Sequence, residues 1–233
     1  MKPFFWNLGW LVLGAAWLGP LPHLARTSFA AHMTLHMAVV AVAAPLLSIG
    51  VAGRRFDPVK RVPALFAPVP ASVGELLIVW AWHSPGLHHF ARFEFLGFVL
   101  EQSMFLAAGV WVWLSAFGGD SPRSRERSAA GVIGLLLTSM HMTLLGALLT
   151  MSPRLLYSHH HSSGKLDPLT DQYLGGAVML VVGGAAFLAG GLWLTTDLVR
   201  SSQTRHRNCR RSYRIPVSSQ TMVASASNTQ AES

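Results

Sequence analysis

The chain has 233 residues, of which 51% are hydrophobic and 12% are charged, and its formal net charge is +8. Ordinary globular domains contain about a quarter charged residues, so this composition excludes an ordinary soluble protein and indicates one integral membrane domain. The basic residues lie between apolar blocks. This arrangement relates the positive charge to membrane topology and argues against nucleic-acid binding.

Six apolar blocks, most of them near the length that spans a bilayer as a helix, follow one another along the chain. They cover residues 4–19, 29–51, 71–83, 93–117, 129–151 and 172–198. The first is short and, with Lys2 before it, is also compatible with a signal peptide. Asn7 and the lack of a convincing cleavage site favour a retained helix. Pro63, Pro68 and Pro70 interrupt regular helix before the third block, which we expect to enter along the interface.

The predicted fold is therefore an all-α bundle of about six transmembrane helices over residues 1–200. Residues 201–233 are basic at first and then rich in Ser, Thr, Gln and Asn. Such a segment has too few apolar residues to bury and is predicted to be disordered. Cys209, the only cysteine, lies in this tail, so the chain can form no internal disulfide and offers no cysteine-rich metal site.

The basic residues divide unevenly between the two sides of this bundle. Fourteen of the eighteen fall on one side, and only Arg26, Arg92, Arg154 and Lys165 fall on the other. The positive-inside rule makes the richer side cytoplasmic. We therefore expect a multi-pass membrane protein with both termini in the cytoplasm, whose basic loops contact anionic lipid.

The histidines show the opposite asymmetry. Seven of the eleven fall in outer loops or at outer helix ends, namely His23, His83, His88, His89, His159, His160 and His161. Two more, His32 and His36, lie in the outer part of the second block, and His141 lies inside the fifth. Only His206 is on the basic side. This distribution indicates that a functional site built from histidines would lie in the outer half of the membrane domain.

Six ionisable residues are candidates for a site in that outer half: His32, His36, His83, Glu101, His141 and Asp171. At 1.5 Å of rise per residue, His36 lies roughly 10 Å, Glu101 about 12 Å and His141 about 15 Å below the outer ends of their helices. An ionisable side chain in a membrane helix costs about 2.5–3.5 kcal/mol and usually marks a functional site. For the three nearest the interface, His32, His83 and Asp171, helix capping or hydrogen bonding between helices is an equal alternative.

Imidazole and thioether groups suggest what such a site would hold. His32 and His36 are four residues apart and share one helix face, so the pair can bind one metal ion. Met33 and Met37 have the same spacing on a second face, where they could serve the site or simply pack. Thioether is a soft ligand that selects Cu(I), while zinc held by histidine and carboxylate is the alternative. We expect His32, His36, Glu101 and His141 to converge, with His83 or Asp171 closing the top.

Five motifs resemble the CtaG family of membrane proteins, the cytochrome c oxidase assembly factors. They are SFAAHMTLHM at 28–37, WAWHSPGLHH at 80–89, LEQSMFLAAGVWVW at 100–113, LLGALLTMSPRLLY at 144–157 and DPLTDQYLGG at 167–176. The family's recurring residues correspond here to His32, His36, Trp82, His83, Pro85, Asp171 and Gln172. The family often has Glu-His in the fourth helix, where this chain has Glu101-Gln102. This departure leaves the ligand set open, and His141 could substitute for the missing histidine.

The resemblance implies a protein of the bacterial plasma membrane that binds copper and delivers it from the outer side to subunits of a haem–copper oxidase, with no catalytic turnover of its own. The loop HSPGLHH, expected to be flexible, would then be the exit for the ion.

Three other functions compete with this one. A cytochrome b-like protein could clamp a haem between His36 and His141. A copper transporter would need a polar path through the inner half, where the sequence offers only Glu75 and hydroxyl residues. A metal-free scaffold for oxidase subunits would use the histidines only as hydrogen-bonding groups between helices.

Overall fold

The computed structural model describes residues 2–119, 125–157 and 166–212. The chain divides into two compact units, Met1–Thr195 and Thr196–Ser233, and the first contains all six candidate residues. The described residues form helices joined by loops, with no strand among them. The predicted all-α class is therefore confirmed.

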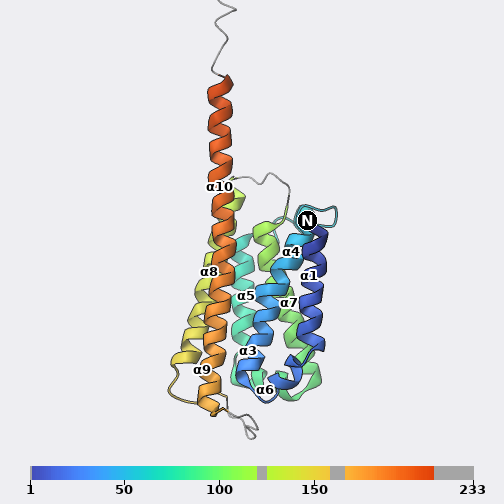
Figure 1. Ribbon diagram of the computed structural model, residues 1–233, viewed down its shortest axis with the longest axis vertical. Helices are drawn as coiled ribbons and strands as arrows, with labels where there is room; N and C mark the ends of the chain where they lie inside the picture. The colour runs from blue at the N-terminus through green and yellow to red at the C-terminus, as the bar shows by residue number, and fades with distance from the viewer. Residues whose placement is uncertain (1, 120–124, 158–165, 213–233) are drawn as a thin grey trace, which may run out of the picture. The chain divides into compact units, whose positions relative to one another are not determined.

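Ten α-helices occur in the described ranges (Figure 1). They are α1 (Lys2–Leu18), α2 (Leu21–Ala25), α3 (Phe29–Met37), α4 (Ala44–Val51), α5 (Pro68–Trp82), α6 (Pro85–Phe93), α7 (Phe95–Phe117), α8 (Arg125–Met151), α9 (Pro168–Val178) and α10 (Gly184–Ser212). A π-helical segment, η1 (Ala38–Ala43), joins α3 to α4, and a second, η3 (Met179–Gly183), joins α9 to α10. One 3-10 turn, η2 (Pro58–Lys60), lies between α4 and α5.

Four continuous helical segments of the described chain are long and apolar enough to cross a membrane, namely Phe29–Val51, Phe95–Phe117, Glu126–Met151 and Pro168–Arg200. The apolar helix α5 is shorter, with 15 residues, and α1 has 17. In the first unit, α1 packs along α4, α7 packs between α4 and α5, and α8 packs against both α5 and α9 (Figure 1). Helix α3 lies against α9, which closes the bundle.

The π-helical segment η1 follows directly after the paired histidines of α3. Pro45, near the start of α4, has no backbone N–H and therefore cannot donate to the carbonyl one turn earlier. A local widening of the helix accommodates this loss. The Trp113 side chain of α7 donates its Nε1–H to the Val40 carbonyl at 3.0 Å, so one carbonyl of the widened turn has a partner. The same indole stacks on Phe187 with ring centroids 5.1 Å apart.

Three segments differ from the sequence-based expectation. The segment HSPGLHH, residues 83–89, is expected to be a flexible loop, but most of it lies in helix α6 (Pro85–Phe93), because Pro85 supplies a preset φ at the first helical position. Helix α5 begins at Pro68, since prolines are tolerated in a first turn. Helix α10 continues to Ser212 through a run of helix-forming Arg and Gln residues, whereas disorder was expected from residue 201. The rest of the tail, and the run His159–His161, lie outside the described residues.

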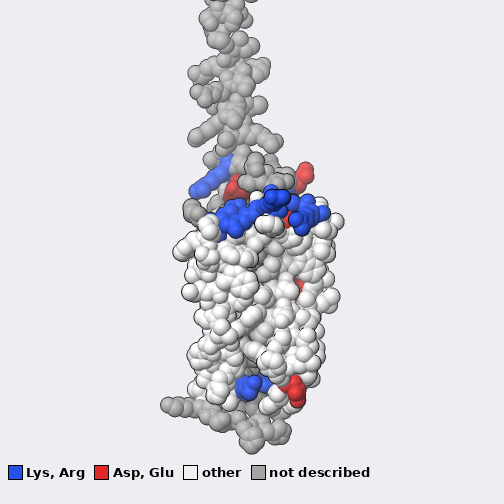
Figure 2. Space-filling view, turned by 90° about the vertical axis from the view of Figure 1, so that its right-hand side faces the viewer, with Lys and Arg blue, Asp and Glu red and all other residues white. Residues whose placement is uncertain are grey.

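On the face shown in Figure 2, charged side chains lie at the two ends of the first unit, with the larger basic group at one end, and the length between them is almost uncharged. The loop between α4 and α5 exposes Arg54, Arg55, Lys60 and Arg61 at that end. An uncharged length with basic residues at one end is the pattern of a membrane protein with a defined orientation. The charge distribution thus agrees with the expected membrane domain.

A buried carboxylate organises this charged end. Asp57 is fully buried and accepts backbone hydrogen bonds from Gly53, Val59 and Gly119 at 2.7, 3.0 and 2.7 Å. Gly53 and Gly119 have φ values of 74° and 91°, which only glycine adopts without strain. Asp57 therefore joins the loop after α4 to the end of α7.

Candidate metal centre

Three buried side chains from two helices form the centre of the candidate site. His32 and His36 of α3 and Glu101 of α7 are each at most 2% exposed. The His32 Nε2 atom lies 3.2 Å from Glu101 Oε1, and the His36 Nε2 atom lies 3.5 Å from the same oxygen. One ligand atom from each residue fits within a mutual distance of 4.8 Å. We call these three residues the inner trio.

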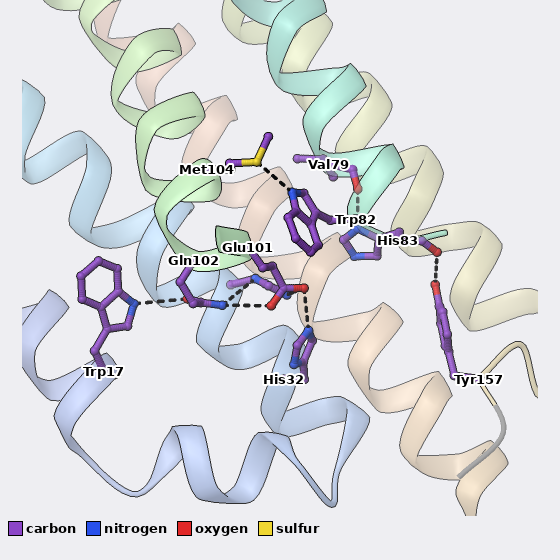
Figure 3. Close-up of polar contacts among 10 residues, drawn as sticks. Trp17, His32, Val79, Trp82, His83, Glu101, Gln102, Met104 and Tyr157 are labelled. Atoms are coloured by element: carbon purple, nitrogen blue, oxygen red, sulfur yellow. Dashed lines mark hydrogen bonds and ion pairs between the residues drawn. The ribbon is translucent and has the colours of Figure 1, made fainter. Parts of the chain in front are cut away.

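Gln102 fixes the orientation of the inner trio from one side (Figure 3). Its Oε1 accepts a hydrogen bond from Trp17 Nε1 at 3.2 Å, and its Nε2 donates to Glu101 Oε2 at 3.4 Å. Indole only donates and a carboxylate only accepts, so these two partners set which end of the amide is which. The same Nε2 lies 3.5 Å from His36 Nδ1, which must then be the acceptor. His36 therefore carries its proton on Nε2, facing Glu101, and metal binding would have to displace that proton.

Two further histidines lie beside the inner trio. The His88 ring of α6 is 4.8 Å from the His32 ring, and the His83 ring at the end of α5 is 6.0 Å from the His36 ring, measured between centroids. Both side chains are buried, and no described residue makes a hydrogen bond to the Nε2 atom of either. The His83 Nδ1–H donates to the Val79 carbonyl at 2.7 Å, which leaves a lone pair on Nε2. Metal-binding histidines commonly have this arrangement.

Burial keeps these two imidazoles neutral. It lowers the pKa of His83 to about 4 and lowers the pKa of His88 well below its ordinary value. The nearby His36 and His32 rings lower these two pKa values further, because each would repel a second positive charge. A neutral imidazole is the form that binds a metal ion.

Asp171 has a different place from the one that the sequence predicts. It lies on α9 at the start of α3, where its Oδ1 accepts from Ser28 Oγ at 2.7 Å and from the Ala30 N–H at 3.2 Å. Its Oδ2 accepts from the Phe29 N–H. The carboxylate therefore caps α3 from a neighbouring helix, which is the alternative role that its position near the interface left open. It is not among the residues that converge around Glu101.

His141 is also placed away from the inner trio. It lies on α8 and faces Glu75 of α5, with 3.9 Å between Nε2 and the Glu75 Oε2 atom. One turn deeper along the same two helices, Thr138 Oγ1 donates to Ser72 Oγ at 3.0 Å. The expected convergence of His141 with His32, His36 and Glu101 is thus not what the structure has. The reason is helix order, since α8 packs against α5 and α9 and so turns this face toward α5.

A family model described as the cytochrome c oxidase caa3 assembly factor (Caa3_CtaG) matches residues 1–201. The chain belongs to this family. The CtaG resemblance that the motifs indicate is therefore confirmed. No curated protein and no solved structure gives a significant match to the chain.

The motif residues of this CtaG-family protein divide into two groups by their contacts. His32 and His36 belong to the inner trio and His83 lies beside it. The side chains of Asp171 and Gln172 instead make hydrogen bonds to backbone groups of neighbouring segments. Gln172 Oε1 accepts from the Leu156 N–H at 2.9 Å, and its Nε2 donates to the Leu149 and Arg154 carbonyls at 3.4 and 3.2 Å. Asp171 and Gln172 therefore fix the start of α3 and the loop after α8.

In this CtaG-family protein His88, which is not among the six candidates predicted from the sequence, lies beside the inner trio. The sequence pattern singles out His83, and a loop expected around His88 and His89 offers no reason to add either of them. A helical spacing provides the missing signal, since His88 and Arg92 are four residues apart and form the buried face of α6, with Ala91 beside them. His89 lies on the exposed face.

The inner trio of this CtaG-family protein fits a small metal ion. Bonds of about 2.0–2.2 Å place two ligand atoms at most about 4.4 Å apart. The two distances to Glu101 already satisfy this limit. A movement of under about 1 Å brings the whole set within range. The Nε2 atom of His83 adds a lone pair next to it, and the Nε2 atom of His88 has no hydrogen-bond partner among the described residues. Met33 and Met37 pack elsewhere, toward Gly175 and Gly183 of the neighbouring segment.

Proposed function

We propose that this membrane protein binds copper as Cu(I) at His32, His36 and Glu101, with His83 nearby, and delivers it from the outer side of the bacterial plasma membrane to a subunit of a haem–copper oxidase. The observation that carries the proposal is the inner trio, three buried ligand groups within 4.8 Å of one another in a helical membrane domain. Membership of a cytochrome c oxidase assembly-factor family supports the oxidase as the partner.

The charge of the site supports a monovalent ion. Glu101 is its one carboxylate among the described residues within 4.8 Å, and in a low-dielectric interior one negative charge is best balanced by one positive charge. Cu(I) provides that charge, and imidazole suits copper. A divalent zinc ion would leave one uncompensated positive charge in the membrane domain, so copper is favoured over zinc.

Handing over the ion requires a site on the side where the oxidase receives it. The inner trio and His83 lie in the half of the bundle opposite the loop of Arg54, Arg55, Lys60 and Arg61. By the positive-inside rule that basic loop is cytoplasmic. The proposed topology therefore puts both termini inside and the histidine cluster toward the cell exterior.

Thiol labelling tests this topology, because Cys209 is the only cysteine. A membrane-impermeant maleimide added to intact cells should not label Cys209 until the membrane is permeabilised. A C209S/E94C variant, with its cysteine at the exposed start of α7, should be labelled in intact cells. Labelling of Cys209 in intact cells contradicts the proposed orientation.

Copper binding and oxidase assembly are tested together in cells that make the oxidase. Purified wild-type protein should contain copper after supplementation, and a H32A/H36A variant should not. Cells with this variant should make oxidase subunits that lack activity, while the variant itself accumulates in the membrane at the wild-type level. Normal oxidase activity at a normal level of the variant rejects copper delivery and favours the metal-free scaffold.

The same preparation tests the haem alternative. His36 and His141, the proposed haem clamp, lie in different clusters, on α3 against α7 and on α8 against α5. We expect no Soret band in the visible spectrum of the purified protein. An intense Soret band would replace copper with haem as the bound group.

A further inference from the structure

His88 lies between the inner trio and the molecular surface. It is 2% exposed, and its ring contacts three other rings: His32 at 4.8 Å, Tyr157 at 4.2 Å and Phe29 at 5.6 Å, measured between centroids. The His32 contact is edge-to-face, with an interplanar angle of 80°. His88 therefore adjoins the inner trio on one side and an outer loop residue on the other.

The chemistry of His88 is that of a ligand without a partner. Its Nε2 atom is buried, and none of the described residues makes a hydrogen bond to it. A buried polar atom left unpaired costs about 1–3 kcal/mol. A metal ion that visits this position would remove that cost. The same holds for the Nε2 atom of His83.

Surrounding contacts hold the two histidines in place. Tyr157 Oη–H donates to the His83 carbonyl at 2.7 Å, as Figure 3 shows, and the Tyr157 ring stacks on Phe29 at 5.0 Å. Tyr157 thus contacts both histidines, the carbonyl of one and the ring of the other. The pair is fixed relative to the outer loop after α8.

Two clefts on either side of α6 reach the cluster from outside. One has a volume of about 60 Å³ and is lined by His88, His89, Tyr157 and neighbouring residues. The other has a volume of about 10 Å³ and reaches His32 directly. One water molecule needs about 10–15 Å³. Of these two clefts, the one at His88 is therefore wide enough for an ion with accompanying waters or for a partner's ligand group, and the one at His32 is not.

From this geometry we infer that His88 is the exchange ligand of the site, through which Cu(I) passes between the inner trio and the outer cleft, with His83 as the adjoining ligand. A bond from the ion to His88 Nε2 forms as a bond to the inner trio breaks, and the ion keeps its oxidation state. The inference rests on the proposed function and deepens it, because it names the path by which the ion moves between the inner trio and the outside.

His89 offers a matched control on the same helix. It has the same side chain and lines the same cleft, but it is exposed and its ring packs against Phe93 at 4.5 Å. Replacing His89 changes the cleft without changing the contact to His32. Any difference between His88→Ala and His89→Ala therefore reports on the position of His88.

The experiment measures how fast bathocuproine disulfonate, a charged chelator, removes Cu(I) from the purified full-length protein. His88→Ala should still bind one ion but release it roughly tenfold more slowly than the wild type, and His89→Ala should release it at the wild-type rate. Free imidazole should restore the rate of His88→Ala, because it can occupy the position of the lost ring next to the cleft. It should not accelerate the wild type or His89→Ala.

The outcomes separate the two proposals. If the wild type binds no Cu(I), the proposed function fails. If the wild type binds Cu(I) but His88→Ala and His89→Ala release it equally fast, only the role of His88 is overturned. Slow release that imidazole does not restore, in a variant with wild-type helix content, also overturns it, since the effect would then be structural.

Discussion

Two glutamate–histidine sites lie inside this protein, and they differ in what surrounds them. Glu101 meets His32 and His36 and is hydrogen-bonded to both His32 and Gln102. Glu75 is equally buried, but its one ion-pair partner among the described residues is His141, at 3.9 Å, and none of them makes a hydrogen bond within 3.5 Å of either of its oxygens. The first site is a connected network and the second is an isolated pair.

The difference teaches that a buried ionisable residue is not by itself a ligand site. Insertion into the membrane costs about the same for either glutamate. Among the described residues, only around Glu101 do three potential ligand groups lie within 4.8 Å of one another, and only there does a further side chain, Gln102, contact the group and fix its orientation. We therefore expect changes at the two sites to affect different properties, metal binding at Glu101 and stability at Glu75.

The largest difference is expected between two double variants. H32A/H36A removes two of the three trio ligands and should lower Cu(I) affinity by more than about a thousandfold, because supporting contacts alone contribute roughly 10–100-fold. E75Q/H141A removes the isolated pair and should leave the affinity within about threefold of the wild type. Competition with a Cu(I) chelator measures both. Equal losses in the two variants would make the isolated pair part of the metal site.

Glu101→Gln is expected to have the second largest effect. It removes the one negative charge while it keeps the size of the side chain, and loss of one partner of a buried charge pair costs about 3 kcal/mol or more, which corresponds to roughly 100-fold in affinity. Glu75→Gln is the matched control. A Glu101→Gln protein that binds Cu(I) as tightly as the wild type would show that the charge does not hold the ion.

Gln102→Ala should lower the affinity by about tenfold, since a contact that orients a ligand is worth roughly 10–100-fold. It frees Glu101 and His36 from the amide that Trp17 holds in place. Gln172→Ala, the control, removes an equally buried amide that bonds only backbone groups, at the end of α8 and in the loop after it, and should lower the unfolding temperature without changing affinity. The same titration measures both variants, and an equal effect of the two would reject an orienting role for Gln102.

The smallest effect is expected from a change that removes the isolated pair without removing its volume. In E75L/H141L, apolar side chains replace four polar atoms that are unpartnered among the described residues. Such replacements stabilise proteins by about 1 kcal/mol or more. Thermal unfolding in detergent measures it. A lower unfolding temperature than the wild type would mean that the pair stabilises the bundle.

Much of this fold could be predicted from the sequence. The six apolar blocks all contain helix, and the deep positions of His36 and Glu101 marked them as candidates before their partners were known. Block boundaries near prolines were less certain, because proline both ends helices and begins them. Helix α6 shows this, since Pro85 begins a helix where a loop was expected.

The parts of the site that could not be predicted depend on packing between distant helices. The spacing of His32 and His36 follows from one helix, but whether His141 joins them depends on which helix α8 faces. The role of Asp171 was left open for the same reason, because a residue at a helix start can reach either a metal or a neighbouring backbone. The position of His88 beside the inner trio could not be predicted because it requires that residues 85–93 form a helix, which turns His88 to the buried side.

The cap that Asp171 provides has a consequence for biosynthesis. Ser28, which the carboxylate contacts at the start of α3, precedes Asp171 by 143 residues. Chains are made from the N-terminus, and earlier segments fold first. When α3 enters the membrane, the N–H groups of Phe29 and Ala30 lack the carboxylate that they contact in the folded protein, because Asp171 of α9 is made only 143 residues after Ser28. The helix that carries His32 and His36 therefore gains its cap only after α9 has been made, so the proposed site is not fully supported before then.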